Sequence, residues 1–232
     1  MYILNRYYIC NNVGNGTQSI FLQDPNVLYF SVHRYHNGNF FPYSKTYKNN
    51  KKSNGGGPSA VGVNEGKGYN VNVGWNQSQM GDLEYMAVWE ILLLPMIREY
   101  KPDLILVSAG FDCGKGDSIG DCNVSPECFG WLTKMLLREN GRVVCTLEGG
   151  YVKSLLGICV ECVLEVLMDE EWKGLKDINS EAEAFLGVDG EGTGKKQKSE
   201  ILMSKIRPSA ANSIRATMKT QEPFWKFLQG NT

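Results

Sequence analysis

Apolar runs of strand length alternate with segments of helical spacing, and this alternation limits the folds that the chain can adopt. The clearest run, residues 103–110, holds four consecutive apolar residues and ends in small ones. It follows residues 82–100, whose acidic first turn and helical spacing predict a long helix, bent at Pro95 and ended by Lys101-Pro102. Strands that alternate with helices form βαβ units with right-handed crossovers. The sequence therefore predicts an α/β fold, a largely parallel sheet with helices on both faces.

Further segments extend this pattern. Residues 27–33 are apolar on both faces, which is typical of a buried strand in a parallel sheet, and residues 142–147 predict another buried strand. Ser125 and Pro126 form the start signal of a helix that runs to residue 139. The remaining predictions are a strand with the alternation of a sheet edge at 69–73, a helix at 152–168, a final helix at 209–229 that Pro223 interrupts, and a long exposed loop at 41–67.

The length suits one domain, because roughly 100–200 residues per domain is usual and the chain has 232. Hydrophobic residues make up 42% and charged residues 21%, as in globular rather than disordered proteins. The composition changes at residue 169, after which charged residues and glycine become frequent. We therefore expect a folded domain at 1–168, followed at 169–232 by a C-terminal helical extension and a charged tail.

Charge and cysteine content restrict the expected partners. The formal net charge is −1, with an isoelectric point of about 6.2, so no cationic field attracts phosphate backbones and we expect no direct binding of nucleic acid. No apolar run reaches the roughly 18 residues that cross a membrane, and the first ten residues lack a signal-peptide pattern. The seven cysteines are odd in number and scattered, which favours reduced thiols. We expect a protein of the nucleus, the cytoplasm or both, without a membrane partner.

Ligands of parallel α/β sheets bind beyond the carboxyl ends of the strands, so the residues that follow the predicted strands are candidates for a site. Asp112 follows one strand, and Glu148-Gly149-Gly150-Tyr151 follows the next. From the residues alone, Asp112 is either a carboxylate that caps a turn or a site residue. Tyr151 either covers the sheet end or lines a site that the two glycines open to a ligand. Complete phosphate-loop and H-E-x-x-H motifs do not occur.

Seven short motifs follow one another between residue 14 and about residue 167. They are Gly14-Asn-Gly-Thr-Gln18, Ser31-Val-His-Arg-Tyr35, Gly38-Asn-Phe-Phe-Pro42, Ser108-Ala-Gly-Phe-Asp112, Gly116-Asp117, Leu132-Thr133 and Leu147-Glu-Gly-Gly-Tyr151. In this order they resemble the zinc-dependent histone deacetylase family, in its class II form. The resemblance implies a parallel-sheet, three-layer arginase/deacetylase-like fold. Residues 1–168 would then form part of a catalytic domain that is incomplete at the N-terminus.

This family hydrolyses the acetyl amide of N6-acetyl-lysine with a zinc ion, a histidine pair and a tyrosine that donates to the oxyanion. The resemblance implies acetylated histones or other proteins as substrates, and corepressor-type proteins as partners. It also implies that Tyr151 is the oxyanion donor and that Asp112 is one of three zinc ligands. The other implied positions are Phe41, Ile119, Gly149 and Gly150 in the substrate channel, and Ser31 and the Val32 carbonyl at a monovalent-cation site, with potassium as the expected ion.

The chain departs from the family's pattern at two places. Where the family has Asp-x-His, the other two zinc-ligand positions hold Cys10 and Asn12, and an amide is a poor zinc ligand. The catalytic histidine pair has no counterpart, because the chain has only His33, which we interpret as a structural imidazole, and His36 in a polar turn. Catalytic zinc normally needs three protein ligands, so the resemblance implies a family member that is inactive as written.

Three hypotheses stay open on the sequence alone. The chain is an inactive deacetylase relative, either truncated or a pseudoenzyme. It is a non-catalytic interaction module that uses its α/β surface and the tail at 169–232, with an amphipathic end that contains Trp225, to bind a protein partner. It is a fragment of an active, longer deacetylase whose His-His pair and Asp-x-His are encoded upstream. A remodelled zinc site built from Cys10, Asn12 and Asp112 is a less favoured alternative to all three.

Overall fold

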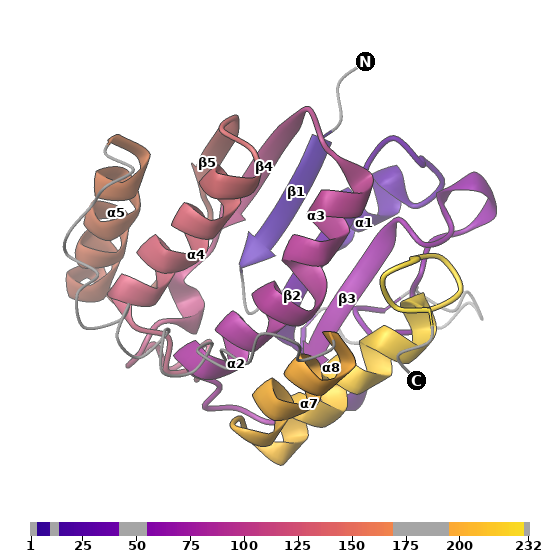
Figure 1. Cartoon of the computed structure of the whole chain (residues 1–232). Helices are drawn as coiled ribbons and strands as arrows, with labels where there is room; N and C mark the ends of the chain where they lie inside the picture. Colours follow the sequence, from indigo (N-terminus) through magenta and orange to yellow (C-terminus); the bar gives the residue numbers. More distant parts are fainter. Residues whose placement is uncertain (1–3, 10–13, 42–54, 169–194, 230–232) are drawn as a thin grey trace, which may run out of the picture.

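The computed structural model describes residues 4–9, 14–41, 55–168 and 195–229; of residues 4–9, 195 and 196 only the backbone is described. Within them, five parallel strands form one sheet in the order β3-β2-β1-β4-β5 (Figure 1). The strands are β1 (Leu4–Ile9), β2 (Tyr29–Arg34), β3 (Asn70–Trp75), β4 (Leu104–Ala109) and β5 (Val143–Leu147). The predicted parallel α/β fold is confirmed, and all four strands that the sequence predicts are present.

The order of the strands creates a switch point between β1 and β4. The chain runs outward from β1 through β2 to β3, returns to the other side of β1, and continues outward through β4 to β5. The last residues of the two central strands, Ile9 and Ala109, are paired with each other. Ligand sites of open parallel sheets lie beyond the carboxyl ends at such a point. The segment that follows Ala109 and carries Asp112 therefore leaves the sheet where a site is expected.

Helices connect and cover these strands. The connection from β3 to β4 consists of α2 (Asp82–Val88), a π-helical segment η3 (Trp89–Leu93) and α3 (Leu94–Tyr100). In Figure 1, α3 and α4 (Pro126–Glu139) lie across the face of the sheet turned to the viewer. The bend predicted near Pro95 takes the form of this wider π turn, because proline has no N–H to bond the carbonyl four residues earlier. The other helices are α1 (Asn15–Phe21), α5 (Lys153–Met168), α7 (Lys195–Ser204) and α8 (Pro208–Gln221).

The helix α4 begins as its sequence predicts. The Ser125 hydroxyl accepts a hydrogen bond of 3.1 Å from the Cys128 amide, and Pro126 is the first helical residue. The same Ser125 hydroxyl donates a hydrogen bond of 2.7 Å to the carboxylate of Asp82, at the start of α2. The starts of α2 and α4 are thus joined through one serine side chain.

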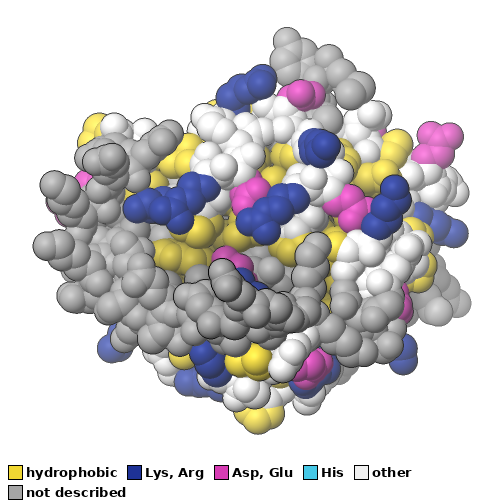
Figure 2. Space-filling view, in the orientation of Figure 1, with side chains coloured by type: hydrophobic (Ala, Val, Ile, Leu, Met, Phe, Trp, Pro, Cys, Tyr) yellow, Lys and Arg dark blue, Asp and Glu magenta, His cyan; other side chains and the backbone are white. Residues whose placement is uncertain are grey.

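The core lies between the sheet and the helices α2 to α4. Its largest fully buried side chains come from β2, β3, the α2–η3 connection and α4, and they include Trp75, Trp89, Tyr29, Tyr85 and Phe129. The six cysteines that the structure describes are free thiols. Burial raises the pKa of Cys122 to about 12. On the face shown in Figure 2, basic and acidic side chains are interspersed among apolar ones.

Strand β5 is not buried, so that prediction is wrong. Among the described residues β5 pairs only with β4 and forms an edge of the sheet. Val144 is 50% exposed and Leu147, at the end of the strand, is 57% exposed. The neighbouring helix α5 packs mainly on α4 and also exposes large apolar side chains. Exposed apolar residues of these two elements are Val144, Leu147, Ile158, Leu164 and Met168.

The opposite edge strand, β3, is covered by α8. The side chains of Ser213, Thr217 and Gln221 donate hydrogen bonds of 2.8 Å each to carbonyls of β3. The acceptors are Gly74, Asn72 and Asn70, respectively. Four helical residues rise about 6 Å and two strand residues about 6.6 Å, so every fourth residue of α8 meets every second residue of β3. The backbone carbonyls of this edge are therefore satisfied within the chain.

The final helix ends where proline predicts. It stops at Gln221, just before Pro223, and the following turn inserts Trp225 against Tyr69 and Tyr100. Trp225 is only 4% exposed, and its indole N–H donates to the Gly68 carbonyl at 3.1 Å. Residues 208–228 therefore pack against β3 and α3 rather than extending from them.

Thr217→Val is expected to lower the free energy of unfolding by about 1–3 kcal/mol, because it keeps the shape of the side chain but leaves the buried Asn72 carbonyl without its donor. Urea denaturation of the purified chain would measure the change. Thr217→Ser keeps the hydroxyl and serves as the control, with a smaller expected loss. A stability of Thr217→Val equal to that of the original chain would show that the hydrogen bond does not matter here.

Candidate active site

Three loops at the carboxyl ends of β2, β4 and β5 carry the predicted channel residues. Phe41 lies after β2, Ile119 after β4 and Tyr151 after β5, and their side chains are 50%, 50% and 57% exposed. Large apolar or aromatic side chains are usually buried, so their exposure at the carboxyl ends of three strands of one sheet favours a binding surface there. The roles implied for these three residues stay predictions.

Asp112 lies in a short 3₁₀ turn, η4 (Phe111–Cys113), directly after β4 and its Gly110. Its side chain is buried, and Gly149 approaches it closely. A Cβ atom on Gly149 would be 3.2 Å from the Asp112 carboxyl carbon. The Phe111 amide also donates to the Gly149 carbonyl at 2.9 Å. A side chain at residue 149 would therefore make a tight contact with Asp112, and the absence of one allows the loop after β5 to lie against that carboxylate.

Gly150 has a φ of +133°, which side-chain-bearing residues rarely adopt. A Cβ there would also lie 3.0 Å from a Leu156 methyl group and 3.2 Å from the Phe111 Cβ. The two glycines before Tyr151 thus meet two separate needs, a close approach at Gly149 and an unusual backbone conformation at Gly150. Their proposed place on a channel wall stays a prediction.

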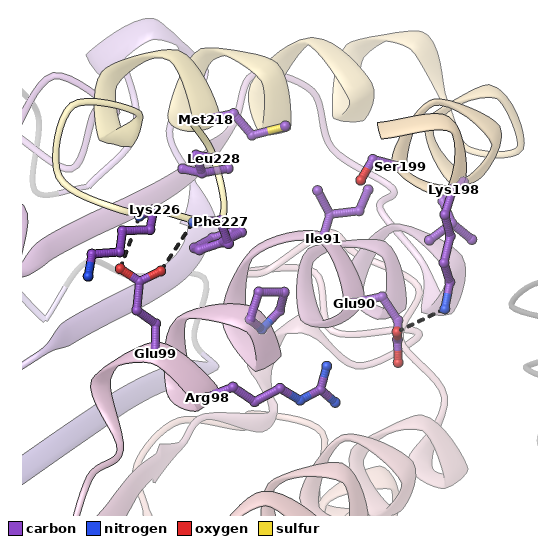
Figure 3. A pocket seen from close by; sticks show the side chains of 12 residues that line it. Glu90, Ile91, Arg98, Glu99, Lys198, Ser199, Met218, Lys226, Phe227 and Leu228 are labelled. Carbon is purple, nitrogen blue, oxygen red and sulfur yellow. Dashed lines mark hydrogen bonds and ion pairs between the residues drawn. The ribbon is translucent and has the colours of Figure 1, made fainter. Parts of the chain in front are cut away.

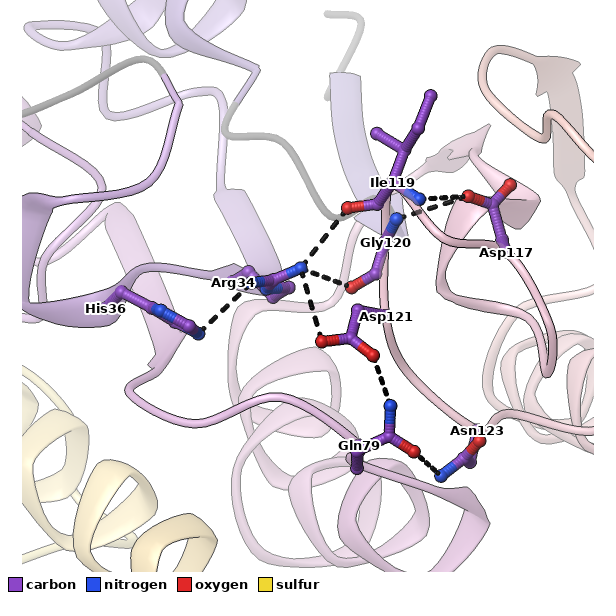
Figure 4. Close-up of polar contacts among 8 residues, drawn as sticks. All are labelled: Arg34, His36, Gln79, Asp117, Ile119, Gly120, Asp121 and Asn123. Atoms are coloured by element: carbon purple, nitrogen blue, oxygen red, sulfur yellow. Dashed lines mark hydrogen bonds and ion pairs between the residues drawn. The ribbon is translucent and has the colours of Figure 1, made fainter.

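Asp117 links two of the three loops (Figure 4). One oxygen of its buried carboxylate accepts from the amides of Ile119 at 2.9 Å and Gly120 at 3.2 Å. The other oxygen accepts from the Tyr151 amide at 2.8 Å. Three N–H donors compensate for the loss of water around the carboxylate. Gly116-Asp117 is one of the seven motifs of the resemblance, but the sequence assigns it no role. The sequence signal that could have identified this link is a carboxylate in a loop bounded by glycines.

Arg34 holds the same loop from the other side (Figure 4). Its guanidinium donates to the carbonyls of Ile119 at 3.2 Å and Gly120 at 3.0 Å, and lies 4.0 Å from the Asp121 carboxylate. The guanidinium carbon also lies 4.2 Å from the centre of the Phe40 ring, a cation–π contact. Arg34, at the end of β2, was not identified from the sequence.

Ser31, Val32 and His33 lie side by side on the buried strand β2. The Ser31 hydroxyl is 2.8 Å from His33 Nδ1, and His33 Nε2 is 2.7 Å from the Gly56 carbonyl. A carbonyl can only accept, so Nε2 carries the proton and Ser31 donates to Nδ1. Burial lowers the pKa of His33 to about 4, and the bond to Gly56 offsets this only in part. The proposal that Ser31 and Val32 bind a monovalent cation stays a prediction.

His36 lies in the turn after β2, with its Nε2 atom 3.4 Å from an Arg34 nitrogen. Partial burial and the Arg34 charge lower its pKa, while Asp121 acts in the opposite direction. Each of the two histidines thus has a partner on or next to β2. The interpretation of His33 as a hydrogen-bonded structural imidazole agrees with these contacts.

The described residues do not form a zinc site. Among them, no three histidine, cysteine or acidic side chains gather where a metal ion could bind. Asp112 is a chemically suitable ligand, but one carboxylate is fewer than the three protein ligands of catalytic zinc sites. Cys10 and Asn12, predicted at the two other ligand positions, lie outside the described residues. The described residues alone therefore supply too few ligands for catalytic zinc, and no reaction step is derived through the metal.

A separate cavity of about 620 Å³ lies between α3, α7 and the segment after α8 (Figure 3). Its charged side chains are engaged within the chain. Lys198 is 3.8 Å from Glu90, and Glu99 accepts from the amides of Lys226 at 3.0 Å and Phe227 at 3.2 Å. The cavity is lined by none of the residues at the strand ends, so it does not belong to the candidate site.

The fold and these strand-end residues define a deacetylase-type α/β protein, and comparison with known proteins identifies the family. The histone deacetylase domain matches residues 13–167, which is more than half of the chain. The chain therefore belongs to the histone deacetylase family. Within the part of the chain that the structure describes, no helix is long and apolar enough to cross a membrane.

The similar proteins are much longer than this chain. Histone deacetylase 18 of Arabidopsis thaliana is 42% identical over 163 residues, which cover 69% of this chain and 23% of that protein. Human histone deacetylase 7 is 42% identical over 183 residues, covering 72% and 18%. The crystal structure of the HDA15 HD domain superposes with a TM-score of 0.75 at 28% identity, covering 99% of this chain and 52% of that one. The chain thus spans about a fifth of its curated relatives and half of a solved domain.

Proposed function

We propose that the chain is a C-terminal part of a class II-like lysine deacetylase domain that does not hydrolyse N6-acetyl-lysine by itself. In this proposal Tyr151 supplies the oxyanion donor, and Phe41, Ile119, Gly149 and Gly150 line the acetyl-lysine channel. Asp112 supplies one zinc ligand, and Ser31 and Val32 belong to a potassium site. Acetylated histones or other proteins are the proposed substrates of the complete domain.

The observation that carries the proposal is the state of the two histidines. His33 is fully buried between Ser31 and Gly56, and His36 contacts Arg34. General base catalysis needs a side chain within reach of the attacking water and a pKa near the working pH. His33 is enclosed and its pKa is about 4, so it is unsuited to that role. Tyr151 then has a donor hydroxyl but no described base to act with.

Zinc content and hydrolysis of an acetyl-lysine peptide, measured on the purified chain, test this proposal. We expect far less than one zinc ion per chain after dialysis and no turnover above buffer. A complete class II deacetylase domain is the positive control. Any turnover must be repeated with Tyr151→Phe, which removes the oxyanion donor and distinguishes this chain's activity from a contaminant. Stoichiometric zinc together with turnover that Tyr151→Phe abolishes would refute the proposal.

Whether a longer product exists is a separate question with its own test. The solved relative has a domain about twice as long as the part that this chain matches. Sequencing the 5′ end of the transcript would decide between a fragment of an active deacetylase and an inactive member. An upstream reading frame that encodes a His-His pair and an Asp-x-His favours the fragment.

A non-catalytic interaction module is the second candidate function, and the exposed apolar side chains of β5 and α5 favour it. The tail around Trp225 does not, since that indole is packed against Tyr69 and Tyr100.

Leu164 and Met168 lie one helical turn apart, so glutamate at both positions would abolish binding of a corepressor-type partner. Phe224→Glu, on a different surface, is the control. Binding that survives the double change would exclude this surface.

The proposed location is the nucleus, the cytoplasm or both. A fluorescent fusion of the full chain, imaged in living cells, would test it. Fluorescence confined to the secretory pathway or to a membrane would contradict it.

A further inference from the structure

We infer that Asp117 is a positioning residue that holds the Ile119 loop and the Tyr151 loop in a fixed relation to each other. The inference rests on the proposed function only where it calls these loops walls of an acetyl-lysine channel. The contacts themselves belong to the described residues. Asp117 is separated from Tyr151 by 34 positions in the sequence, yet one side chain bonds the backbone of both loops.

The geometry of the carboxylate carries the inference. Asp117 is 2% exposed, and its two oxygens accept from different loops. Figure 4 shows the oxygen that binds the Ile119 loop. One oxygen accepts from the amides of its own loop, Ile119 and Gly120, and the other accepts from Tyr151. A carboxylate has acceptors on both sides, so it can bridge two sets of N–H donors, whereas an amide or hydroxyl side chain cannot do so with equal strength.

The Tyr151 loop has two other described backbone ties to the β4 side, the bonds from the Glu148 amide to the Ala109 carbonyl and from the Phe111 amide to the Gly149 carbonyl. Both ties lie at least two positions before the tyrosine, and Gly150, which follows them, has no side chain to restrict its backbone. The bond from Asp117 therefore fixes the backbone of Tyr151 directly. The phenol then has a fixed point of attachment, from which rotation about χ1 and χ2 sets its direction.

The Ile119 loop is held on both sides of its backbone. Asp117 binds the amides of Ile119 and Gly120, and Arg34 binds their carbonyls. Arg34 in turn lies over Phe40, next to Phe41. The three exposed side chains on the strand ends are thus connected through two buried or nearly buried charged residues, and Asp117 is the member that reaches Tyr151.

Hydrogen exchange of the backbone amides, measured by NMR on the full chain, tests the inference without zinc or turnover. Asp117→Ala should speed exchange at Ile119, Gly120 and Tyr151 by about 10- to 100-fold, since a hydrogen bond to a charged group is lost at each. Asp117→Asn has one oxygen, so it can serve only one loop, and we expect the other loop alone to accelerate. Asp103→Asn, an exposed carboxylate before β4, is the control and should change none of them.

NMR relaxation of the ¹³C-labelled Tyr151 ring measures the mobility of the phenol. A purely structural role of Asp117 would not change this mobility selectively. The phenol should become more mobile in Asp117→Ala while the ring of buried Tyr29 does not. Unchanged exchange at Tyr151 in Asp117→Ala overturns the inference. The inference is also overturned if amide exchange in Asp117→Asn accelerates equally in both loops, in β4 and in α4. That result would mean a general loss of stability. If exchange responds as expected but the chain holds stoichiometric zinc and hydrolyses an acetyl-lysine peptide, the proposed function fails and the inference stands.

Discussion

Trp225→Ala is expected to lower the free energy of unfolding by about 3–5 kcal/mol, the usual cost of removing a buried tryptophan. The indole is 4% exposed and contacts Tyr69, Tyr100 and Phe227 edge to face. Its loss also removes the donor to the Gly68 carbonyl. Urea denaturation followed by far-ultraviolet circular dichroism measures the change without relying on tryptophan fluorescence.

The adjacent Phe224 provides a matched control. It is 39% exposed, so Phe224→Ala should cost about 1 kcal/mol, well below the loss for Trp225. Similar losses in the two variants would contradict the structure's placement of these neighbouring aromatic residues.

Acidification from pH 7 to pH 4 is expected to remove about 3 kcal/mol of stability through His33 alone. The pKa of His33 is about 4 in the folded chain, against an ordinary value of 6.5, because burial disfavours the charged imidazole. Between these two values the unfolded chain binds a proton that the folded chain does not. Stability is therefore complete above pH 6.5 and falls as the pH approaches 4.

Comparison with His33→Gln isolates this contribution, since carboxylates also titrate over the same range. Urea denaturation at several pH values should show a steeper loss in the original chain than in His33→Gln. His36→Gln, at a more exposed histidine, should leave the steep loss in place. Parallel curves for the original chain and His33→Gln would mean that His33 titrates normally.

The sequence predicts the elements whose signals are local. The apolar run of β4 and the Ser125-Pro126 start of α4 are such signals, and both elements form as expected. Strand β1 was missed because Asn5 and Arg6 interrupt its apolar residues. The exposure of β5 was missed because an apolar run shows that a strand forms, not how many of its faces are covered.

The candidate site likewise has residues that local sequence signals predict and contacts that they do not. Asp112 and Tyr151 follow predicted strands, so the rule for parallel sheets identifies them without any knowledge of their neighbours. The link from Asp117 to Tyr151 and that from Arg34 to the Ile119 loop connect residues more than 30 positions apart. Such pairs exist only after the chain has folded, and no periodicity in the sequence reports them. Cys10 and Asn12 lie outside the described residues, so their part in a metal site stays a prediction.

The hydroxyl and amide side chains of α8 have an effect on how copies of this molecule can associate. With the carbonyls of β3 already occupied, another strand cannot add at that end of the described sheet. Among the described strands, β5 is then the one whose outer backbone no other strand pairs. Within the described sheet, edge-to-edge association of two copies would therefore join β5 to β5 about a twofold axis and stop at a pair, which limits growth into a fibre.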